Sequence, residues 1–380
     1  MPKILRIVNR FNLGGPTFNA AYLTKYLSPD YETLLIGGTH TESEESSDHI
    51  LNNLGVDFVK IDEMSREVSL LNDYKAYKKI KQIIADFKPD IVHTHASKAG
   101  LLGRLAAKKM GVKVIVHTFH GHVFHSYFGS LKTKIFLNLE RYLAKKSSKI
   151  IAISNIQKQE LSEKYKIAEA EKFKVINLGF DLSKFQENIF ENRKQFREKY
   201  KIAEKEIVIS IVGRLVPIKN HKMFIDAISN LKTDKQFKAF IVGGGELFDE
   251  LKYYVAEKDL QHKIIFTSWI KETELVYAGS DIIALTSLNE GTPVSLIEAQ
   301  ASGLPVVTTN VGGVKDITSE NSSIIVEQKI KDLTNAFAKM IENYDIYQTN
   351  AEENKKIILE KFGYKRLISD YKKLYSELLS

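Results

Sequence analysis

The 380-residue sequence contains no cysteine. Disulfide bonds and thiol chemistry are therefore excluded, and the composition is compatible with a reducing cytoplasm. The sequence also has no apolar run that approaches the ~20 residues needed for a membrane-spanning helix. Residues 1–15 have too short an apolar core for a signal peptide, and we expect a first β-strand there instead.

Positive charge is distributed unevenly along the chain. Residues 1–180 contain 27 Lys and Arg against 18 Asp and Glu, a net charge of +9, whereas residues 181–380 contain 28 against 29, a net charge of −1. A basic surface suits nucleic acid, anionic lipid or a phosphorylated substrate, although solubility alone is the simpler explanation. No nucleic-acid-binding motif accompanies the basic half, so we expect no nucleic-acid partner.

Length and strand pattern together predict the fold class. A chain of 380 residues suits two domains at ~100–200 residues each, and its apolar content of 43% is ordinary for a globular chain. Short apolar segments alternate with helical patterns in the first half, and the alternation starts again near residue 207. We therefore expect an α/β protein with two doubly wound domains that face each other across a cleft.

Residues 281–313 are the most informative stretch of the sequence. Residues 281–289 form an apolar run of the kind found in buried parallel strands. The chain then breaks at residues 289–293, and a helical pattern runs from Val294 until Gly303 ends it. The stretch is therefore predicted to be a strand, a loop and a helix, followed by a further strand.

Two carboxylates lie in this stretch. Glu290 is in the loop at the carboxyl end of the strand, where parallel sheets bind ligands, and Glu298 is on the helix. The backbone amides of the first helical turn, at Val294, Ser295 and Leu296, can receive a phosphate. The simpler alternative is that one glutamate starts a helix and the other is solvated.

The spacing of Glu290 and Glu298, with AQASGLPVVTTNVGG after the second one, resembles the donor-site signature of retaining GT4-type glycosyltransferases. These enzymes have the GT-B fold of two Rossmann-like domains. The commoner form has Phe-Gly where this sequence has Thr292 and Pro293, a difference that keeps both carboxylates but makes the donor sugar harder to name. The resemblance implies that Glu290 acts on the sugar as a catalytic residue and that Glu298 binds the ribose.

The resemblance covers nearly the whole chain and implies its domain organisation. Residues 1–178 would be the acceptor-side domain, and residues 179–363 would be the domain that binds the nucleotide sugar. The last helix, 364–380, would return to the first domain.

Two cations follow the predicted strand at residues 207–212. Arg214 and Lys219 lie on one loop, and a cationic pair after a buried strand suits a diphosphate, although two surface cations are the alternative. Their segment, GRLVPIKN, also resembles the diphosphate clamp of the family.

Glycines follow two of the predicted strands. Gly14 and Gly15 let a ligand approach the backbone closely, and the resemblance places the matching loop over the donor phosphates. Gly245 allows tight packing against the nucleotide or a neighbouring loop. Ile270 matches a position where the backbone of relatives reads the nucleobase.

Six of the ten histidines lie between residues 93 and 125, at or near the carboxyl ends of two predicted strands. The spacing of His93 with His95 and of His120 with His122 is compatible with metal ligation. No cysteine and no acidic metal-binding motif accompanies these residues, so we expect no metal.

We favour a role in binding sugars for this part of the sequence. His93, His95, Lys98 and His122 would form a polar wall on the acceptor side. His120, in a Thr-x-His context, resembles a histidine that relatives place near the reacting sugar, and we expect it to be catalytic. Structural histidines with polar partners are the alternative, above all for His93.

The resemblance implies transfer of a hexose or N-acetylhexosamine from a UDP-sugar to a lipid-linked glycan, with retention, in synthesis of a surface polysaccharide such as O-antigen or capsule. The nucleotide sugar would be a co-substrate, and no cofactor is expected. The enzyme would be cytoplasmic, with peripheral contact at the inner membrane face, and the basic, aromatic helix at residues 131–146 could lie on anionic lipid or simply pack. The alternatives are a nucleotide-sugar 2-epimerase and a non-catalytic nucleotide-sugar-binding protein.

Overall fold

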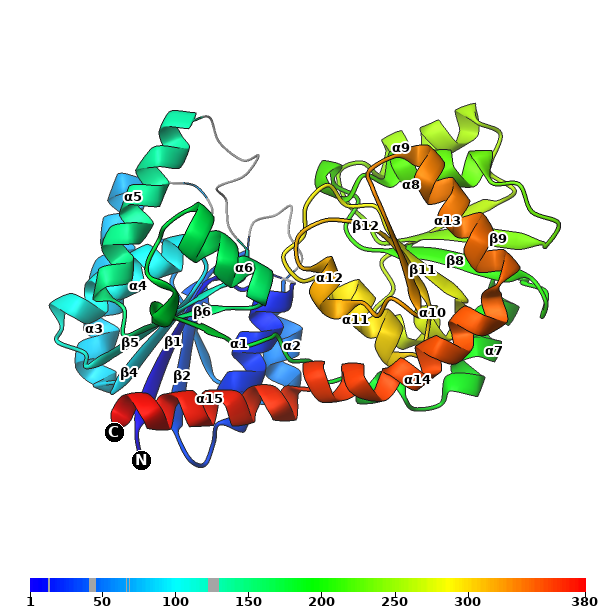
Figure 1. Cartoon of the computed structure of the whole chain (residues 1–380). Coiled ribbons are helices and arrows are strands. Elements are labelled where there is room, and N and C mark those ends of the chain that lie inside the picture. Colours follow the sequence, from blue (N-terminus) through cyan, green and yellow to red (C-terminus); the bar gives the residue numbers. More distant parts are fainter. Residues whose placement is uncertain (13, 41–45, 66, 68, 122–129) are drawn as a thin grey trace. The chain divides into compact units, whose positions relative to one another are not determined.

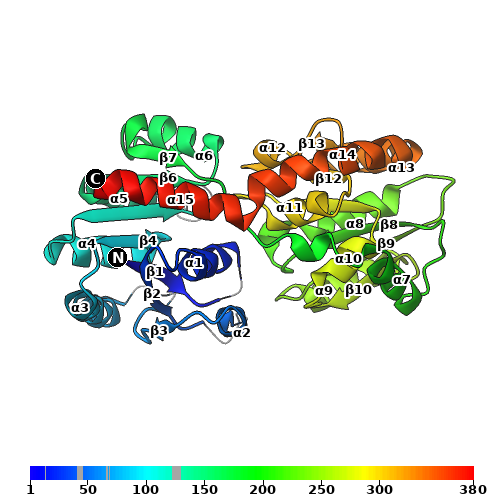
Figure 2. The same ribbon diagram turned by 90° about the horizontal axis from the view of Figure 1, so that it is seen from below.

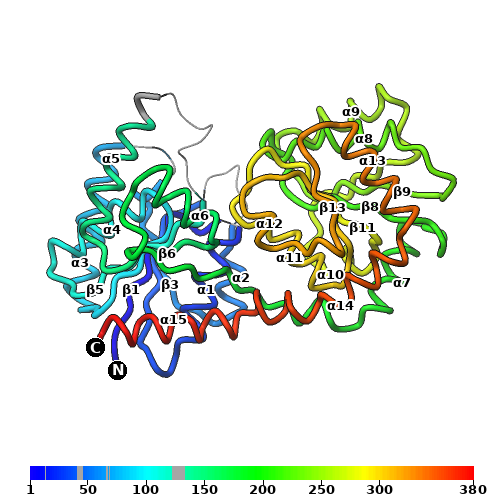
Figure 3. The backbone as a smooth tube through the Cα atoms, in the orientation of Figure 1, coloured from blue at the N-terminus to red at the C-terminus, as the bar shows by residue number. Residues whose placement is uncertain are grey.

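The paired strands of the chain run parallel and form two sheets in the part that the structure describes. The computed structural model describes residues 1–12, 14–40, 46–65, 67, 69–121 and 130–380. Residues 1–180 and 362–380 make one compact unit, unit 1, and residues 181–361 make the other, unit 2 (Figure 1). The trace leaves unit 1 after Phe180 and returns to it at Phe362 (Figure 3).

The helices and strands of unit 1 are β1 (Lys3–Arg10), α1 (Gly15–Tyr26), β2 (Glu32–Gly38), α2 (Asp48–Asn53), β3 (Phe58–Lys60), α3 (Leu70–Phe87), β4 (Ile91–His95), α4 (Ser97–Lys109), β5 (Val114–Phe119), α5 (Ser130–Lys146), β6 (Lys149–Ala152), α6 (Asn155–Gln159), β7 (Phe173–Val175) and α15 (Tyr364–Leu379).

The sheet of unit 1 has the strand order β3-β2-β1-β4-β5-β6-β7. Successive residues of a strand point to opposite faces. Ile4 of β1 therefore packs in one cluster with α1 and with Leu367 and Leu374 of α15, whereas Leu5 packs with α3 and α4. Figure 2 shows these helices on both sides of the sheet. The last helix of the chain thus completes the core of the first unit.

The helices and strands of unit 2 are α7 (Ile189–Lys199), β8 (Ile207–Val212), α8 (His221–Asn230), β9 (Phe237–Val242), α9 (Phe248–Glu257), β10 (Ile264–Ser268), α10 (Thr273–Gly279), β11 (Ile282–Leu285), α11 (Val294–Ala301), β12 (Val306–Thr309), α12 (Val314–Ile317), β13 (Ser323–Val326), α13 (Ile330–Glu342) and α14 (Tyr344–Phe362), the last residue of which belongs to unit 1.

The sheet of unit 2 has the strand order β10-β9-β8-β11-β12-β13. Ile209 of β8 packs with α8, α9 and α13, and its neighbour Val208 packs on the other face with Phe196 of α7 and Val276 of α10. Helices therefore cover both faces of this sheet as well, and its strand ends are left for loops.

The sequence predicted the bounds of some elements correctly and missed other elements. The strand predicted at residues 207–212 is confirmed as β8. Helix α7 was not predicted, because it is mostly charged, buries only Phe196 and Arg197 and so has no apolar stripe.

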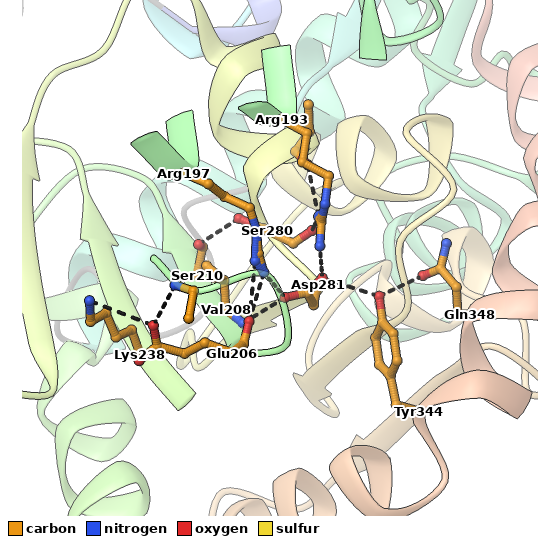
Figure 4. Close-up of polar contacts among 12 residues, drawn as sticks. Arg193, Arg197, Glu206, Val208, Ser210, Lys238, Ser280, Asp281, Tyr344 and Gln348 are labelled. Carbon is orange, nitrogen blue, oxygen red and sulfur yellow. Dashed lines mark hydrogen bonds and ion pairs between the residues drawn. The ribbon is translucent and has the colours of Figure 1, made fainter. Parts of the chain in front are cut away.

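A buried carboxylate at the amino end of β11 joins four elements of unit 2 (Figure 4). Asp281 is only 2% exposed. Its Oδ1 accepts a hydrogen bond from Arg193 at 2.8 Å, and its Oδ2 accepts from Arg197 at 3.1 Å and from the Val208 amide at 2.7 Å. The hydroxyl of Tyr344 on α14 donates to Oδ1 at 3.4 Å. This network holds α7, β8 and α14 together at the amino ends of the central strands. The loops described in the next section leave the opposite, carboxyl ends.

Replacing Asp281 should destabilise unit 2. The variant Asp281→Asn leaves the mostly buried Arg197 guanidinium without its ionic partner, so we expect the free energy of unfolding to fall by about 3–5 kcal/mol in urea denaturation. The matched control is Asp234→Asn, an exposed loop position of the same unit, which should change it by less than about 0.5 kcal/mol. Equal unfolding of the two variants would contradict the role given to this network.

Candidate active site

The direction of the sheet winding in unit 2 changes between β8 and β11. From β8 the chain continues to β9 and β10 on one side, whereas β11, β12 and β13 extend on the other. The loops that leave the carboxyl ends of β8 and β11, residues 213–220 and 286–293, therefore diverge at this point. Such a switch point is where open parallel sheets bind their ligands.

These two loops are bonded to each other through backbone and side chains. The Leu288 amide donates to the Ile218 carbonyl at 2.8 Å, and the Thr286 hydroxyl donates to the Lys219 carbonyl at 3.0 Å. Between them, Lys219 Nζ lies 2.5 Å from Glu290 Oε1, and the two side chains are 23% and 12% exposed. The structure thus brings together a cation and a carboxylate that the sequence assigned to the site from separate segments.

Glu290 is held by its surroundings as well as by Lys219. The hydroxyl of Ser287 donates to the same carboxylate oxygen at 2.6 Å. Gly312, with φ +48°, packs so closely that a Cβ there would lie 1.7 Å from the Glu290 carbonyl oxygen, and only glycine fits. The Gly313 amide donates to the Gly291 carbonyl at 3.0 Å. The glycine pair that ends the family signature therefore shapes the backbone at Glu290.

The first turn of α11 offers two free amides, not three. The Leu296 amide donates to the Pro293 carbonyl at 3.2 Å, which corrects the prediction for Leu296 because its donor is already used. The amides of Val294 and Ser295 have no acceptor among the described residues. These two remain the candidates for binding a phosphate at the positive end of the helix.

Glu298 is positioned by a residue that the sequence analysis did not assign. The hydroxyl of the buried Tyr277 on α10 donates to Glu298 Oε2 at 2.8 Å. Burial raises the pKa of the Glu298 carboxyl, and this hydrogen bond opposes the shift. Glu298 Oε1 has no partner within the described chain, so one oxygen remains available to a ligand hydroxyl. No motif signals Tyr277, because the pairing of α10 with α11 depends on the tertiary fold.

Arg214 lies on a loop that Gly245 shapes. The side chain of Arg214 is exposed and has no hydrogen-bond partner in the described part of the protein. The Leu215 amide donates to the Gly244 carbonyl at 2.9 Å, and a Cβ at Gly245 would lie 2.5 Å from the Leu215 carbonyl oxygen. Of the two roles considered for Gly245, packing against a neighbouring loop is the one that these contacts support, and a nucleoside contact stays a prediction.

The segment after β10 presents an aromatic ring. Trp269 is 46% exposed, and its indole Nε1 lies against Gly244, where a Cβ would be 2.6 Å away. The side chain of Ile270 packs into the cluster around Val208 and Phe240. A nucleobase contact by the backbone at Ile270 stays a prediction. Trp269, which the analysis did not assign, is the single tryptophan of the sequence.

In unit 1, the predicted glycine and lysine residues lie near the carboxyl ends of β1 and β4. Gly14 is the N-cap of α1 and Gly15 its first residue. Their contact with donor phosphates stays a prediction. Lys98 Nζ lies 2.7 Å from Asp73 Oδ1 and its side chain is only 11% exposed, so it forms an ion pair between α4 and α3. An acceptor-side role for Lys98 would require this pair to open.

The structure corrects the predicted polar wall of histidines. His93 and His95 are 0% and 1% exposed, so neither residue is part of an open wall in this structure. His93 hydrogen-bonds instead to Tyr375, at 2.6 Å, and to Thr118, at 2.7 Å. This is the structural alternative that the sequence left open. His122 lies outside the described residues.

Among the described histidines of this group, His120 is the one that keeps some exposure. Its Nε2 lies 2.8 Å from His95 Nδ1, and burial lowers the pKa of its ring to about 4. Its catalytic role stays a prediction. Within the described ranges, no group of three or more His, Cys, Asp or Glu side chains is arranged to hold a metal ion.

Two family models match the chain. Residues 192–357 match the glycosyl transferases group 1, and residues 14–184 match glycosyltransferase family 4. The UDP-Gal:alpha-D-GlcNAc-diphosphoundecaprenol alpha-1,3-galactosyltransferase of Escherichia coli is 31% identical over 347 residues, 89% of this chain and 88% of the relative. The chain belongs to the group 1 glycosyltransferases.

Other comparisons agree with this family and with its GT-B fold. The capsular polysaccharide biosynthesis glycosyltransferase CapM of Staphylococcus aureus is 25% identical over 83% of this chain and 84% of its own. The crystal structure of Anabaena Alr3699/HepE in complex with UDP and glucose matches with a TM-score of 0.85 and 19% identity, covering 99% of this chain and 100% of that one. The protein is thus a transferase with two α/β units, each built on one sheet of parallel strands. None of its described helices is both long and apolar enough to cross a membrane.

Proposed function

We propose that this glycosyltransferase moves a hexose or N-acetylhexosamine from a UDP-sugar to a lipid-linked glycan, with retention, during synthesis of a surface polysaccharide. The contact between Lys219 and Glu290 at the switch point of unit 2 is the main support, because it joins a cation to a carboxylate on the loop that leads into α11. The names of the relatives support the substrate class, since they mention UDP-Gal, a diphosphoundecaprenol acceptor and a capsular polysaccharide.

Each side chain at the site has a part in binding the donor. Arg214 and Lys219 would neutralise the diphosphate together with the amides of Val294 and Ser295, and the free oxygen of Glu298 would accept a hydrogen bond from a ribose hydroxyl. Lys219 would then exchange its partner, since the diphosphate competes with Glu290 for the ammonium group. This exchange would leave the Glu290 carboxylate facing the sugar, still held by Ser287.

The reaction breaks the bond between the anomeric carbon and the diphosphate oxygen and forms a bond from that carbon to the acceptor oxygen on the same face. The acceptor proton would pass to the departing phosphate, which needs no protein nucleophile. Positive charge develops at the anomeric carbon as the first bond lengthens. A preorganised carboxylate at Glu290 stabilises that charge more in the transition state than in the ground state.

Helix α5 of unit 1 supports peripheral contact with the cytoplasmic face of a membrane. Its Ile135 and Tyr142 are 60% and 51% exposed, beside the exposed Lys134 and Lys145. The Lys146 ammonium lies 4.3 Å from the centroid of the Tyr142 ring. An exposed face that mixes lysine with apolar and aromatic side chains fits the interface of an anionic bilayer, where the lipid acceptor would be found.

Sugar transfer can be tested with defined substrates. Incubation with a panel of UDP-hexoses and UDP-N-acetylhexosamines and an N-acetylglucosaminyl-diphosphate lipid should add one sugar to the lipid, as measured by mass spectrometry. NMR of the product should show that the transferred sugar has the same anomeric configuration as in the donor. Epimerised UDP-sugar without transfer to any lipid would contradict the proposal and favour a nucleotide-sugar epimerase.

The two carboxylates should fail differently when each is neutralised. Glu290→Gln should lower kcat by roughly 10²–10³-fold with little loss of UDP affinity, because its contact matters in the transition state. Glu298→Gln should raise the donor KM roughly 10–100-fold, because it loses a charged hydrogen bond that is made in both states. UDP affinity can be followed by the fluorescence of Trp269, the single tryptophan.

Circular dichroism provides the folding control for both variants. The assigned roles are wrong if Glu290→Gln loses UDP affinity while turnover at saturating donor survives.

Membrane contact should depend on the lysines of α5. Binding to phosphatidylglycerol vesicles should weaken with added salt and fall by roughly 30-fold in Lys134→Ala/Lys145→Ala, at about 1 kcal/mol for each lysine. Lys205→Ala, an exposed lysine in unit 2, is the matched control and should have little effect. Equal binding to neutral phosphatidylcholine vesicles would contradict a role of these lysines in binding anionic lipid, and their charge would then serve solubility only.

A further inference from the structure

A buried arginine begins a chain of hydrogen bonds that ends at His120. Arg6 of β1 is 0% exposed, and the described residues around it supply imidazole and phenol groups. Its Nη1 lies 2.8 Å from His93 Nδ1, 3.4 Å from His95 Nε2 and 3.3 Å from the Tyr375 hydroxyl. A guanidinium group can only donate hydrogen bonds, so both imidazole nitrogens that face Arg6 must present lone pairs.

That constraint decides where the proton of His95 lies. With its Nε2 lone pair turned to Arg6, a neutral His95 carries its proton on Nδ1. His95 is neutral, since burial lowers its pKa well below the usual value. Its Nδ1–H then donates to His120 Nε2, which is 2.8 Å away. The opposite tautomer would direct the N–H of His95 at the N–H groups of Arg6.

The hydrogen bond with His95 also fixes the tautomer of His120. Because its Nε2 accepts the hydrogen bond from His95, the proton of the neutral ring must lie on Nδ1. His120 Nδ1 is buried and has no hydrogen-bond partner among the residues that the structure describes. The ring therefore has one donor left unused, while its basic nitrogen is occupied.

We propose that Arg6 and His95 are positioning residues that hold His120 in the Nδ1–H tautomer, so that His120 gives a substrate oxygen a hydrogen bond and does not act as a general base. The part about substrate rests on the proposed function, whereas the tautomer does not depend on it. A carboxylate in place of His95 would have the reverse effect, because it would accept a hydrogen bond from His120 Nε2–H. Because this chain of hydrogen bonds begins at the cationic Arg6, the Nδ1–H group of His120 is left as a donor.

The tautomer can be measured directly in the complete protein. Long-range ¹H–¹⁵N correlation spectra of protein labelled with ¹⁵N-histidine, recorded near pH 7.5, distinguish Nδ1–H from Nε2–H rings. The His120 signals are identified by their loss in His120→Asn. We expect the Nδ1–H pattern in the wild type, and the Nε2–H pattern would overturn the proposal.

Two isosteric variants test the part of His95. The side chain of Asn places an amide where His95 has Nδ1, so His95→Asn can still donate and should keep the Nδ1–H form of His120. His95→Asp places a carboxylate there and should give Nε2–H or imidazolium signals, with thermal unfolding as the control for folding. An unchanged Nδ1–H ring in His95→Asp would overturn the role of His95.

Kinetics then separate this inference from the proposed function. His95→Asp and His120→Ala should both lower kcat by roughly 10²-fold, as expected for a lost donor, with UDP affinity unchanged. His95→Asn should retain most of the wild-type turnover, which a merely structural role would not predict. If the wild type has the Nδ1–H ring but transfers no sugar from any donor, the proposed function fails while the positioning of His120 stands.

Discussion

The ion pair between Lys219 and Glu290 connects the two loops on which the candidate donor site depends. The loops after β8 and β11 leave the sheet in different directions, so the point between them is open to a ligand. The ion pair keeps both side chains at this point before any substrate arrives. In the proposed function, a diphosphate would replace Glu290 as the partner of Lys219, and the released carboxylate would then meet the sugar. Binding and catalysis would thus be coupled through one exchange of partners.

The supports of this pair explain much of the sequence around it. Gly312 allows the loop after β12 to touch the Glu290 backbone, and Gly245 allows the loop after β9 to touch the segment that carries Arg214. At the other end of the sheet, Asp281 fixes α7, β8 and α14 through its buried hydrogen bonds (Figure 4). Rigid strands therefore anchor the loops that carry the candidate ligand-binding side chains.

Sequence reasoning succeeded where local pattern determines structure. The apolar run at residues 207–212 is β8. Lys219 was assigned to the site because parallel sheets bind ligands at the carboxyl ends of their strands. Predictions failed where the contacts join segments that lie far apart in the sequence. The histidines were expected to form an open polar wall because they lie near two strand ends, but Tyr371 and Tyr375 of the last helix pack against His93, and Arg6 bonds to His93 and His95. Tyr277 was missed for the same reason, since no local pattern pairs it with Glu298.

The most direct test of this account is a crystal structure of the protein with UDP bound. We predict that the diphosphate contacts Arg214, Lys219 and the amides of Val294 and Ser295, and that Lys219 Nζ moves away from Glu290 Oε1. Glu298 should contact the ribose while it keeps its hydrogen bond from Tyr277. A diphosphate bound elsewhere, with the ion pair between Lys219 and Glu290 unchanged, would contradict the account.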